Sequence, residues 1–480
     1  MLLNMIQKEI LHHILSVRFV ALLLMCLLLI PLTLSINYRN YRQNLVDYQE
    51  AIKLANIEET TVNPKMPLEP ELEVSKLFLK PMPLSVFANG LGDVLPSYLG
   101  MTRNGITQGP PALVSEPLSY LLGHLDFLFV VGTVFSLLAL LFTFDAVAGE
   151  REAGTLRITL ANALPRDLFL WSKLIGGYFV FVVPFLVSFL VGLLLLVSQG
   201  FPLGESDIFP RVLSLTLGSL LYIAVFFAIG VVISTYLDNS KTALILAFTV
   251  WVFAVLIAPR VGFLAAKFIA PTPTSQSVYL EKTAARENYD AELLAKRGKI
   301  HQELWTARKQ NFTASEDTQA LIPLGMEVGK EVDERMKSLE AEYRQKIENH
   351  AAEIDRNYQR EKARQEQVGE VLSRITPTAS LIYLATSLTE TGKQKRSDYL
   401  QTGKHYYGVL YRDLFSKIVD HVSVRTMTPD DVVTIAQPPP LETTTLGETF
   451  RQSTVDMLLL CFFAVVLTTI AFLKFFRSDI

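Results

Sequence analysis

The charged residues with the most informative spacing lie in one segment, residues 145–173, between two uncharged apolar runs. Glu150 and Glu152 flank Arg151, and Gly154 follows them. A glycine lets the chain turn back, because it adopts backbone conformations that other residues avoid. Two carboxylates beside a guanidinium have the chemistry to pair with charges in a groove of another protein. We therefore expect the tip of this segment to dock a soluble partner; the alternative is a solvated loop without a partner.

The sequence offers no chemistry for catalysis or for metal binding. It has no Gly-x-x-x-x-Gly-Lys-Ser/Thr loop, so the chain cannot bind ATP through a P-loop. Its two cysteines, Cys26 and Cys461, lie in apolar runs and lack the spacing of metal ligands. His12 and His13 are adjacent and would point to different faces of a helix. We expect no catalytic residue, cofactor or metal in this chain, and a net charge of −3 gives no basic excess for nucleic acid.

The elements that must position the charged segment are apolar. Of the 480 residues, 50% are hydrophobic and 19% are charged, a balance typical of a polytopic membrane protein. A helix that crosses a bilayer needs about 20 apolar residues. The runs of suitable length are residues 19–36, 127–144, 174–197, 212–236, 242–258 and 457–473. The predicted fold is an all-α membrane protein with six transmembrane helices and two outward-facing segments.

Basic residues in the short flanking segments set the orientation of these helices. The positive-inside rule places both termini in the cytoplasm, with a tail at 474–480, and leaves residues 37–125 and 259–455 outside. Residues 1–18 form an amphipathic helix on the cytoplasmic membrane surface, because isoleucines recur along one face. No ionisable residue lies within the six runs, which disfavours an ion-coupled carrier, since such carriers need charged relays in the membrane.

The larger outward segment is predicted to be a long α-helical hairpin, or stalk. One arm covers about 274–311, and Pro323-Leu-Gly325 interrupts the chain before the second arm. Apolar or aromatic residues recur every three or four positions in the second arm and mark one face of a helix. The residues of this stalk face are Met336, Leu339, Tyr343, Ile347, Ile354 and Tyr358. We interpret the face as the packing surface of the hairpin; docking of a partner protein is the alternative.

Prolines are expected to shape the remaining outward parts. Lys80–Leu91 holds two prolines and a glycine and is predicted to be extended or turning. The prolines at 259–273 and 438–440 are expected to stiffen the connections to the fifth and sixth spans.

The charged segment resembles the coupling segment of an ABC transporter permease of the type-2 exporter class. The matching residues are Asp145, 149–152, 154–156, 165–166 and 173–174. Residues 1–18 are similar to the elbow helix of the same class. Other residues resemble a bacterial subgroup with a large periplasmic insertion, a domain of unknown function, between spans five and six. They are 80–81, 83–85, 137–139, 259–260, Pro271, Pro273, 376–377 and 391–392. One departure is Thr376, where a serine is expected before proline.

The resemblance implies a permease subunit of the bacterial cytoplasmic (inner) membrane. It would couple ATP hydrolysis on a separate subunit to export or to mechanical action on a periplasmic cargo that the sequence does not identify. The implied partners are the bilayer, two P-loop ATPase subunits that hold ATP and Mg, a second permease chain that is a copy or a relative, and a candidate periplasmic protein. The coupling residues would be Asp145, Glu150, Arg151, Glu152, Gly154, Thr155, Arg166 and Lys173. The alternatives are a membrane-anchored scaffold or sensor without transport, and a secondary carrier or channel.

Overall fold

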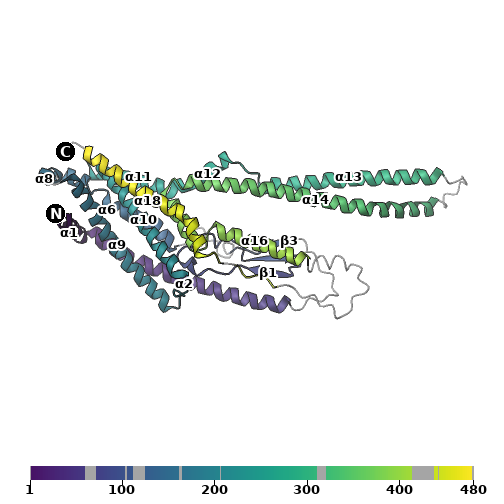
Figure 1. The fold of residues 1–480 in the computed structure, drawn as a ribbon, viewed down its shortest axis with the longest axis horizontal. Helices are drawn as coiled ribbons and strands as arrows, with labels where there is room; N and C mark the ends of the chain where they lie inside the picture. Colours follow the sequence, from purple (N-terminus) through teal and green to yellow (C-terminus); the bar gives the residue numbers. More distant parts are fainter. Residues whose placement is uncertain are drawn as a thin grey trace. The chain divides into compact units, whose positions relative to one another are not determined.

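The computed structural model describes residues 2–59, 72–102, 105–111, 125–161, 165–205, 207–310, 321–412, 437–441 and 443–477. The chain divides into two compact units, one of Met1–Pro259 with Arg374–Ile480 and the other of Arg260–Ser373 (Figure 1). Within the described residues, 6 helices are long and apolar enough to cross a membrane. The prediction of a helical, multi-pass membrane protein is therefore confirmed.

The first unit holds the apolar helices and a small sheet. Its elements are α1 (Leu2–Ile14), α2 (Val17–Glu59), β1 (Ser75–Phe78), η1 (Pro83–Val86), β2 (Tyr98–Thr102), β3 (Gly105–Gln108), α5 (Phe127–Phe129), η2 (Val130–Phe135), α6 (Ser136–Thr143), α7 (Ala148–Glu152), α8 (Thr155–Ala161), α9 (Arg166–Ser198), α10 (Ile208–Tyr236), α11 (Ser240–Trp251), η3 (Val252–Ile257), α15 (Pro377–Leu388), α16 (Lys393–Leu410) and α18 (Leu446–Arg477). The helix that carries the first predicted span continues well past residue 36, to Glu59.

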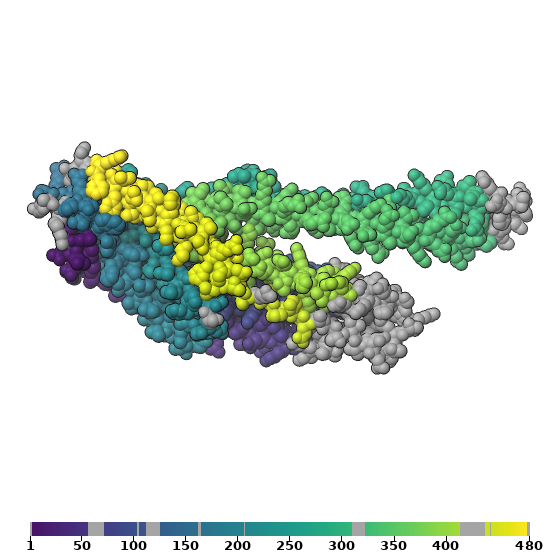
Figure 2. Space-filling view, viewed as in Figure 1, coloured from purple at the N-terminus to yellow at the C-terminus, as the bar shows by residue number. Residues whose placement is uncertain are grey.

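The apolar helices pack against one another around buried aromatic rings. α2 lies against α9, and α10 contacts α6, α15 and α18. Gly192 permits the close approach of α9 to α2, because a Cβ at that position would lie 2.8 Å from Leu34 Cδ1. Phe127 and Phe189 are among the buried rings, with centroids 5.2 Å apart. Figure 2 shows α18, in yellow, lying across the surface of this unit.

Two of the apolar helices contain a wide π-helical turn. η2 lies between α5 and α6, and η3 follows α11. Such turns interrupt the regular i→i−4 hydrogen bonds of an α-helix. The Tyr222 hydroxyl donates to the Gly132 carbonyl at 2.8 Å, and Trp251 Nε1 donates to Ser136 Oγ at 2.9 Å. Side chains of α10 and α11 therefore bond to the wide turn and to the residue that follows it.

A short buried helix, α15, packs between α10 and α18 and is too short to be a predicted span. Pro377 occupies its first turn, and Thr376 Oγ1 accepts a hydrogen bond from the Ala379 amide at 3.4 Å. A threonine hydroxyl thus supplies the cap that a serine would supply. Just before the helix, Arg374 donates to Asp456 on α18 at 2.7 Å, and Asp456 is buried.

The sequence did not predict the sheet. β2 pairs antiparallel with β1 and with β3, so that Leu77 faces Leu99 and Met101 faces Ile106. α16 covers the sheet, and a Cβ on Gly403 would lie 2.4 Å from Leu99 Cδ1. Because the strands are only 4 or 5 residues long, their period-two pattern is too short to distinguish them from turning chain.

The second unit is a helical hairpin. Its long arms are α13 (Ser275–Gln310) and α14 (Leu321–Ser373), which follow the end of α12 (Ala258–Ile269). The arms are antiparallel, since Lys282 pairs with Asp355 and Arg297 with Asp333. Residue 311, the last of the predicted first arm, lies outside the described residues.

The predicted stalk face of α14 is turned toward α13. Met336, Tyr343 and Ile354 are buried, and Leu339, Ile347 and Tyr358 are partly buried. Met336 and Leu339 join a cluster with Leu304 of α13. The packing interpretation of this face therefore accounts for its apolar side chains.

Two local predictions about proline were wrong. Pro323 does not interrupt the hairpin arm, because it lies in the first turn of α14, where a missing N–H costs no hydrogen bond. Pro259 does not leave the helix either: it lies in α12, directly after the wide turn of η3, where the regular ladder is already interrupted. Only the short stretch 270–274 separates α12 from α13.

Candidate functional site

The segment predicted to dock a partner folds into two short helices at one end of the first unit. α7 ends at Glu152, and the chain turns at Gly154, whose φ of +70° is strained for any residue with a Cβ. α8 begins at Thr155 and ends at Ala161. The chain therefore makes a charged helix, a glycine turn and a second helix before α9 begins at Arg166.

The start of α7 is held by the end of α10. Ser234 Oγ accepts hydrogen bonds from the amides of Val147 and Ala148, at 2.9 and 3.0 Å. Ser234, Val147 and Ala148 are fully buried. Two amides that the short helix leaves without an intrahelical partner are thus satisfied from another helix. No local pattern in the sequence marks Ser234, because its partners lie almost ninety residues away.

Lys173 forms the centre of a buried charge cluster that joins three segments. Its Nζ lies 3.0 Å from Glu9 Oε1 of α1 and 3.0 Å from Glu150 Oε1 of α7. Thr155 Oγ1 donates to the other oxygen of Glu150. Lys173 is only 9% exposed. Glu150 is therefore only partly exposed and is bound by groups of the fold, which corrects the expectation that it belongs to a freely exposed acidic tip.

Arg151 and Glu152 hold the short connection between α10 and α11. Arg151 Nη1 donates to Asp238 at 2.8 Å, and the Ser240 amide donates to Glu152 Oε2 at 3.0 Å. Ser240 is the first residue of α11, so Glu152 caps that helix together with Asn239. Glu152 remains exposed, unlike Glu150.

Asp145 and Arg166 bind the remaining helix ends. Asp145 accepts two hydrogen bonds from the Arg18 guanidinium, at 2.7 and 2.9 Å, which links the end of α6 to the start of α2. Arg166 Nη1 donates to the Phe476 carbonyl at 3.0 Å, near the last turn of α18, where a helix favours positive charge. The sequence analysis did not predict this role of Arg18, whose partner lies more than a hundred residues away.

α8 has one buried face and one exposed face. Leu156 is buried in a cluster with Phe169, Phe475 and other side chains of α9, α10 and α18. Ile158, two residues further on, is 67% exposed and points away from that cluster. The surface that remains accessible includes Glu152, Gly154, Thr155, Arg157 and Ile158. Its composition, an acidic and a basic side chain around one exposed isoleucine, suits contact with another protein.

Metal chemistry finds no support in the geometry. Within the part of the chain that the structure describes, no three His, Cys, Asp or Glu side chains gather as metal ligands would. The carboxylates of the site bind lysine, arginine and backbone amides, and these contacts position helices rather than activate a substrate.

Six long apolar helices among the described residues, with a polar segment held against their ends, define a multi-pass membrane protein. The family model described as ABC-2 family transporter protein matches residues 3–480, and the chain belongs to this family. The chain is accordingly a permease component of an ABC transporter, a membrane component that is not itself catalytic and whose family associates with an ATPase subunit. A search of curated proteins gave no match.

Proposed function

We propose that this permease couples ATP hydrolysis on separate ATPase subunits to export, or to mechanical action on a periplasmic cargo, through α7 and α8. One observation carries the proposal: the two short helices are bound to many helix ends at once. Lys173 links them to α1 and α9, Ser234 to α10, and Glu152 to α11. A force applied to the exposed face of α8 would thus reach several membrane helices without loss in a flexible loop.

The assembly that we propose has two permease chains, identical or related, and two ATPases that carry ATP and Mg. It lies in a bacterial cytoplasmic membrane, with α1, α7 and α8 on the cytoplasmic side and the hairpin of α13 and α14 in the periplasm. The basic residues around α7 and α8 support this orientation. The family membership supports the ATPase partner.

Replacing Ile158 by aspartate is expected to weaken association with the ATPase. An isoleucine that is exposed in the free chain and becomes buried in an interface contributes about 1.5–3 kcal/mol to the free energy of binding. Its loss therefore weakens the affinity roughly ten- to a hundredfold. Co-purification of the ATPase with the Ile158→Asp permease, after co-expression of both, measures the effect. The fold should be unaffected, because Ile158 is already 67% exposed.

The matched control is Leu54→Asp, which places the same charge at a 64% exposed leucine near the far end of α2. This variant should retain the ATPase. If Ile158 lies in the lipid interface and not against a partner, Ile158→Asp will co-purify as well as the control does, and α8 loses its proposed role as the docking surface.

The orientation is expected to show in cysteine labelling from outside the cell. In a background with Cys26 and Cys461 replaced by alanine, Glu340→Cys on the exposed side of α14 should react with a membrane-impermeant maleimide on intact spheroplasts. Arg157→Cys on α8 should react only after the membrane is permeabilised. The reverse pattern would invert the proposed topology.

A further inference from the structure

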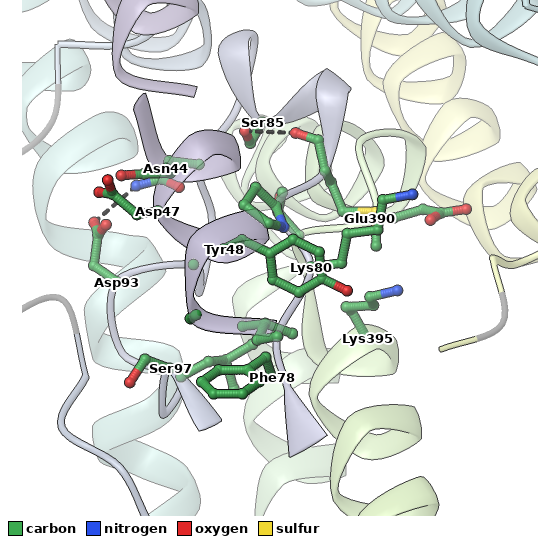
Figure 3. Close-up of a pocket in the computed structure, with 18 residues that line it drawn as sticks. Asn44, Asp47, Tyr48, Phe78, Lys80, Ser85, Asp93, Ser97, Glu390 and Lys395 are labelled. Atoms are coloured by element: carbon green, nitrogen blue, oxygen red, sulfur yellow. Dashed lines mark hydrogen bonds between the residues drawn. The ribbon is translucent and has the colours of Figure 1, made fainter. Parts of the chain in front are cut away.

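A cavity of about 390 Å³ lies in the first unit, at the opposite end from α7 and α8. Its walls are the last part of α2, the chain from β1 through η1 to β2, and the turn that leads into α16. Figure 3 shows Glu390 and Lys395 on one side, Asn44, Asp47 and Asp93 on the other, and Tyr48 and Lys80 between them. Its volume falls in the range of pockets that enclose small molecules.

Lys395 is the most unusual residue of this cavity. It lies in the first turn of α16 and is only 6% exposed. Among the described residues, its Nζ has no hydrogen-bond partner. Burial lowers the pKa of the Lys395 ammonium from its ordinary value, and the neighbouring Lys80 lowers the pKa further. A buried ammonium without an acceptor is costly, so it marks a place where a ligand, and not the fold, supplies the counter-charge.

Two of the acidic side chains that line the cavity, Glu390 and Asp93, are engaged elsewhere. Glu390 pairs with Arg211 at 2.9 Å and accepts from Thr444 at 2.6 Å. Asp93 accepts from Asn89 at 2.8 Å. Glu390 and Asp398 raise the pKa of Lys395 from a distance, but neither accepts a hydrogen bond from its Nζ. Two lysines and Asp47 thus face the cavity, whereas the carboxylates of Glu390 and Asp93 are turned to other partners.

The remaining walls of the cavity are largely apolar. Their apolar side chains are those of Phe78, Leu79, Pro81, Met82 and Leu95. An apolar wall beside a pair of ammonium groups matches a ligand with one charged end and one apolar part. A bare inorganic anion would leave most of this wall against water.

We propose that this cavity binds an amphiphilic anion, with its phosphate or carboxylate between Lys395 and Lys80 and its apolar chain against Phe78 and Met82. Asn44–Ala51 of α2 lie 8 to 15 residues beyond the apolar run that ends at Ile36. At about 1.5 Å per residue this places the cavity roughly 12–22 Å further along the helix axis. The ligand must therefore leave the hydrocarbon layer to bind, which favours a molecule with a single chain over a lipid that stays in the bilayer. The site does not depend on the coupling role of α7 and α8.

The test uses the full chain in a neutral detergent and titrates it with lysophosphatidate, which has one acyl chain and one phosphate. Isothermal titration should show saturable binding to the unmodified protein. Lys395→Met should weaken binding at least tenfold, and Lys80→Met should also weaken it, whereas Lys395→Arg should retain most of the affinity. Lys404→Met is the matched control, because Lys404 is an exposed lysine of the same helix and should be neutral in effect.

The unfolding temperature, measured with and without ligand, distinguishes a lysine that binds the ligand from one that stabilises the fold. Without ligand, Lys395→Met should unfold at the same or a higher temperature than the unmodified protein, because it removes a buried charge that has no protein acceptor. With lysophosphatidate, only proteins that keep Lys395 or Arg at this position should gain a thermal shift. A lower unfolding temperature for ligand-free Lys395→Met, or equal affinity in both proteins, would overturn the proposal.

Further probes define the ligand and its source. Lysophosphatidylcholine has the same chain with a zwitterionic head and should bind at least tenfold more weakly; equal binding would refute the anionic site. Inorganic phosphate alone should not compete, and effective competition would refute the amphiphile. Phosphatidate in nanodiscs competes with the probe if the bilayer supplies the ligand, and fails to compete if the ligand arrives as a free monomer. Either source agrees with the proposed chemistry.

Discussion

Replacing Lys173 by methionine is expected to destabilise the end of the first unit that carries α7 and α8 more than any single change on its surface. The substitution leaves Glu9 and Glu150 close together without the ammonium that now bridges them at 3.0 Å each. Removal of one partner from a buried ion pair costs about 3–5 kcal/mol, because an uncompensated charge remains in a poorly solvated place. Thermal unfolding in detergent should show a clear drop in midpoint, and less of the variant should reach the membrane.

The rescue experiment identifies the cause. A triple variant with Lys173→Met, Glu9→Gln and Glu150→Gln has no net charge in the cluster, so it should recover most of the lost stability. If stability stays low in the triple variant, the methionine fits the site poorly and charge is not the reason. An unchanged midpoint in the single variant would show that the cluster is open to water.

Replacing Glu390 by glycine is expected to destabilise the other end of the first unit, although glycine suits its backbone. Glu390 follows α15 with a φ of +54°, a conformation that costs a residue with a side chain about 1–2 kcal/mol. Its carboxylate, however, pairs with Arg211, which is only 4% exposed. Loss of the carboxylate would leave a buried guanidinium, at about 3–5 kcal/mol. The loss of the ion pair should outweigh the relief of backbone strain, with a net loss of stability of roughly 1–4 kcal/mol.

The double variant Arg211→Met with Glu390→Gly separates the two effects. It keeps the relaxed backbone and removes the unpaired guanidinium, so it should be more stable than Glu390→Gly alone in chemical or thermal unfolding. A Glu390→Gly protein that is more stable than the parent would mean that backbone strain outweighs the ion pair.

The features that the sequence predicts well are those carried by neighbouring residues. Apolar runs predict the membrane helices, and the spacing from Met336 to Tyr358 predicts the packed face of α14. The charged residues before Gly154 and the turn at this glycine are visible because both are local patterns. The proline predictions at Pro259 and Pro323 failed because each proline occupies a position in a helix where its missing N–H is tolerated.

The features that cannot be predicted from the sequence depend on contacts between distant segments. Glu150 looks like an exposed charge in the sequence, and only the folded chain places Lys173 and Glu9 beside it. Ser234 and Lys395 are inconspicuous because a serine near a helix end and a lysine in a helix are both common. What distinguishes them is burial and the presence or absence of a partner, and neither is a property of local sequence.

The wide turn η2 determines the direction in which the side chains of α6, and Asp145 after it, point around the helix axis. A π turn accommodates one more residue than an α turn, and successive residues of an α-helix are rotated by about 100° and rise about 1.5 Å. If the same six residues, Val130–Phe135, formed a regular α-helix instead, α6 would be turned by roughly that angle about its own axis. Asp145 would then face away from Arg18, its partner at 2.7 Å. The alignment of Asp145 with Arg18 at one end of the helix thus depends on a π-helical turn that lies several turns earlier in the chain.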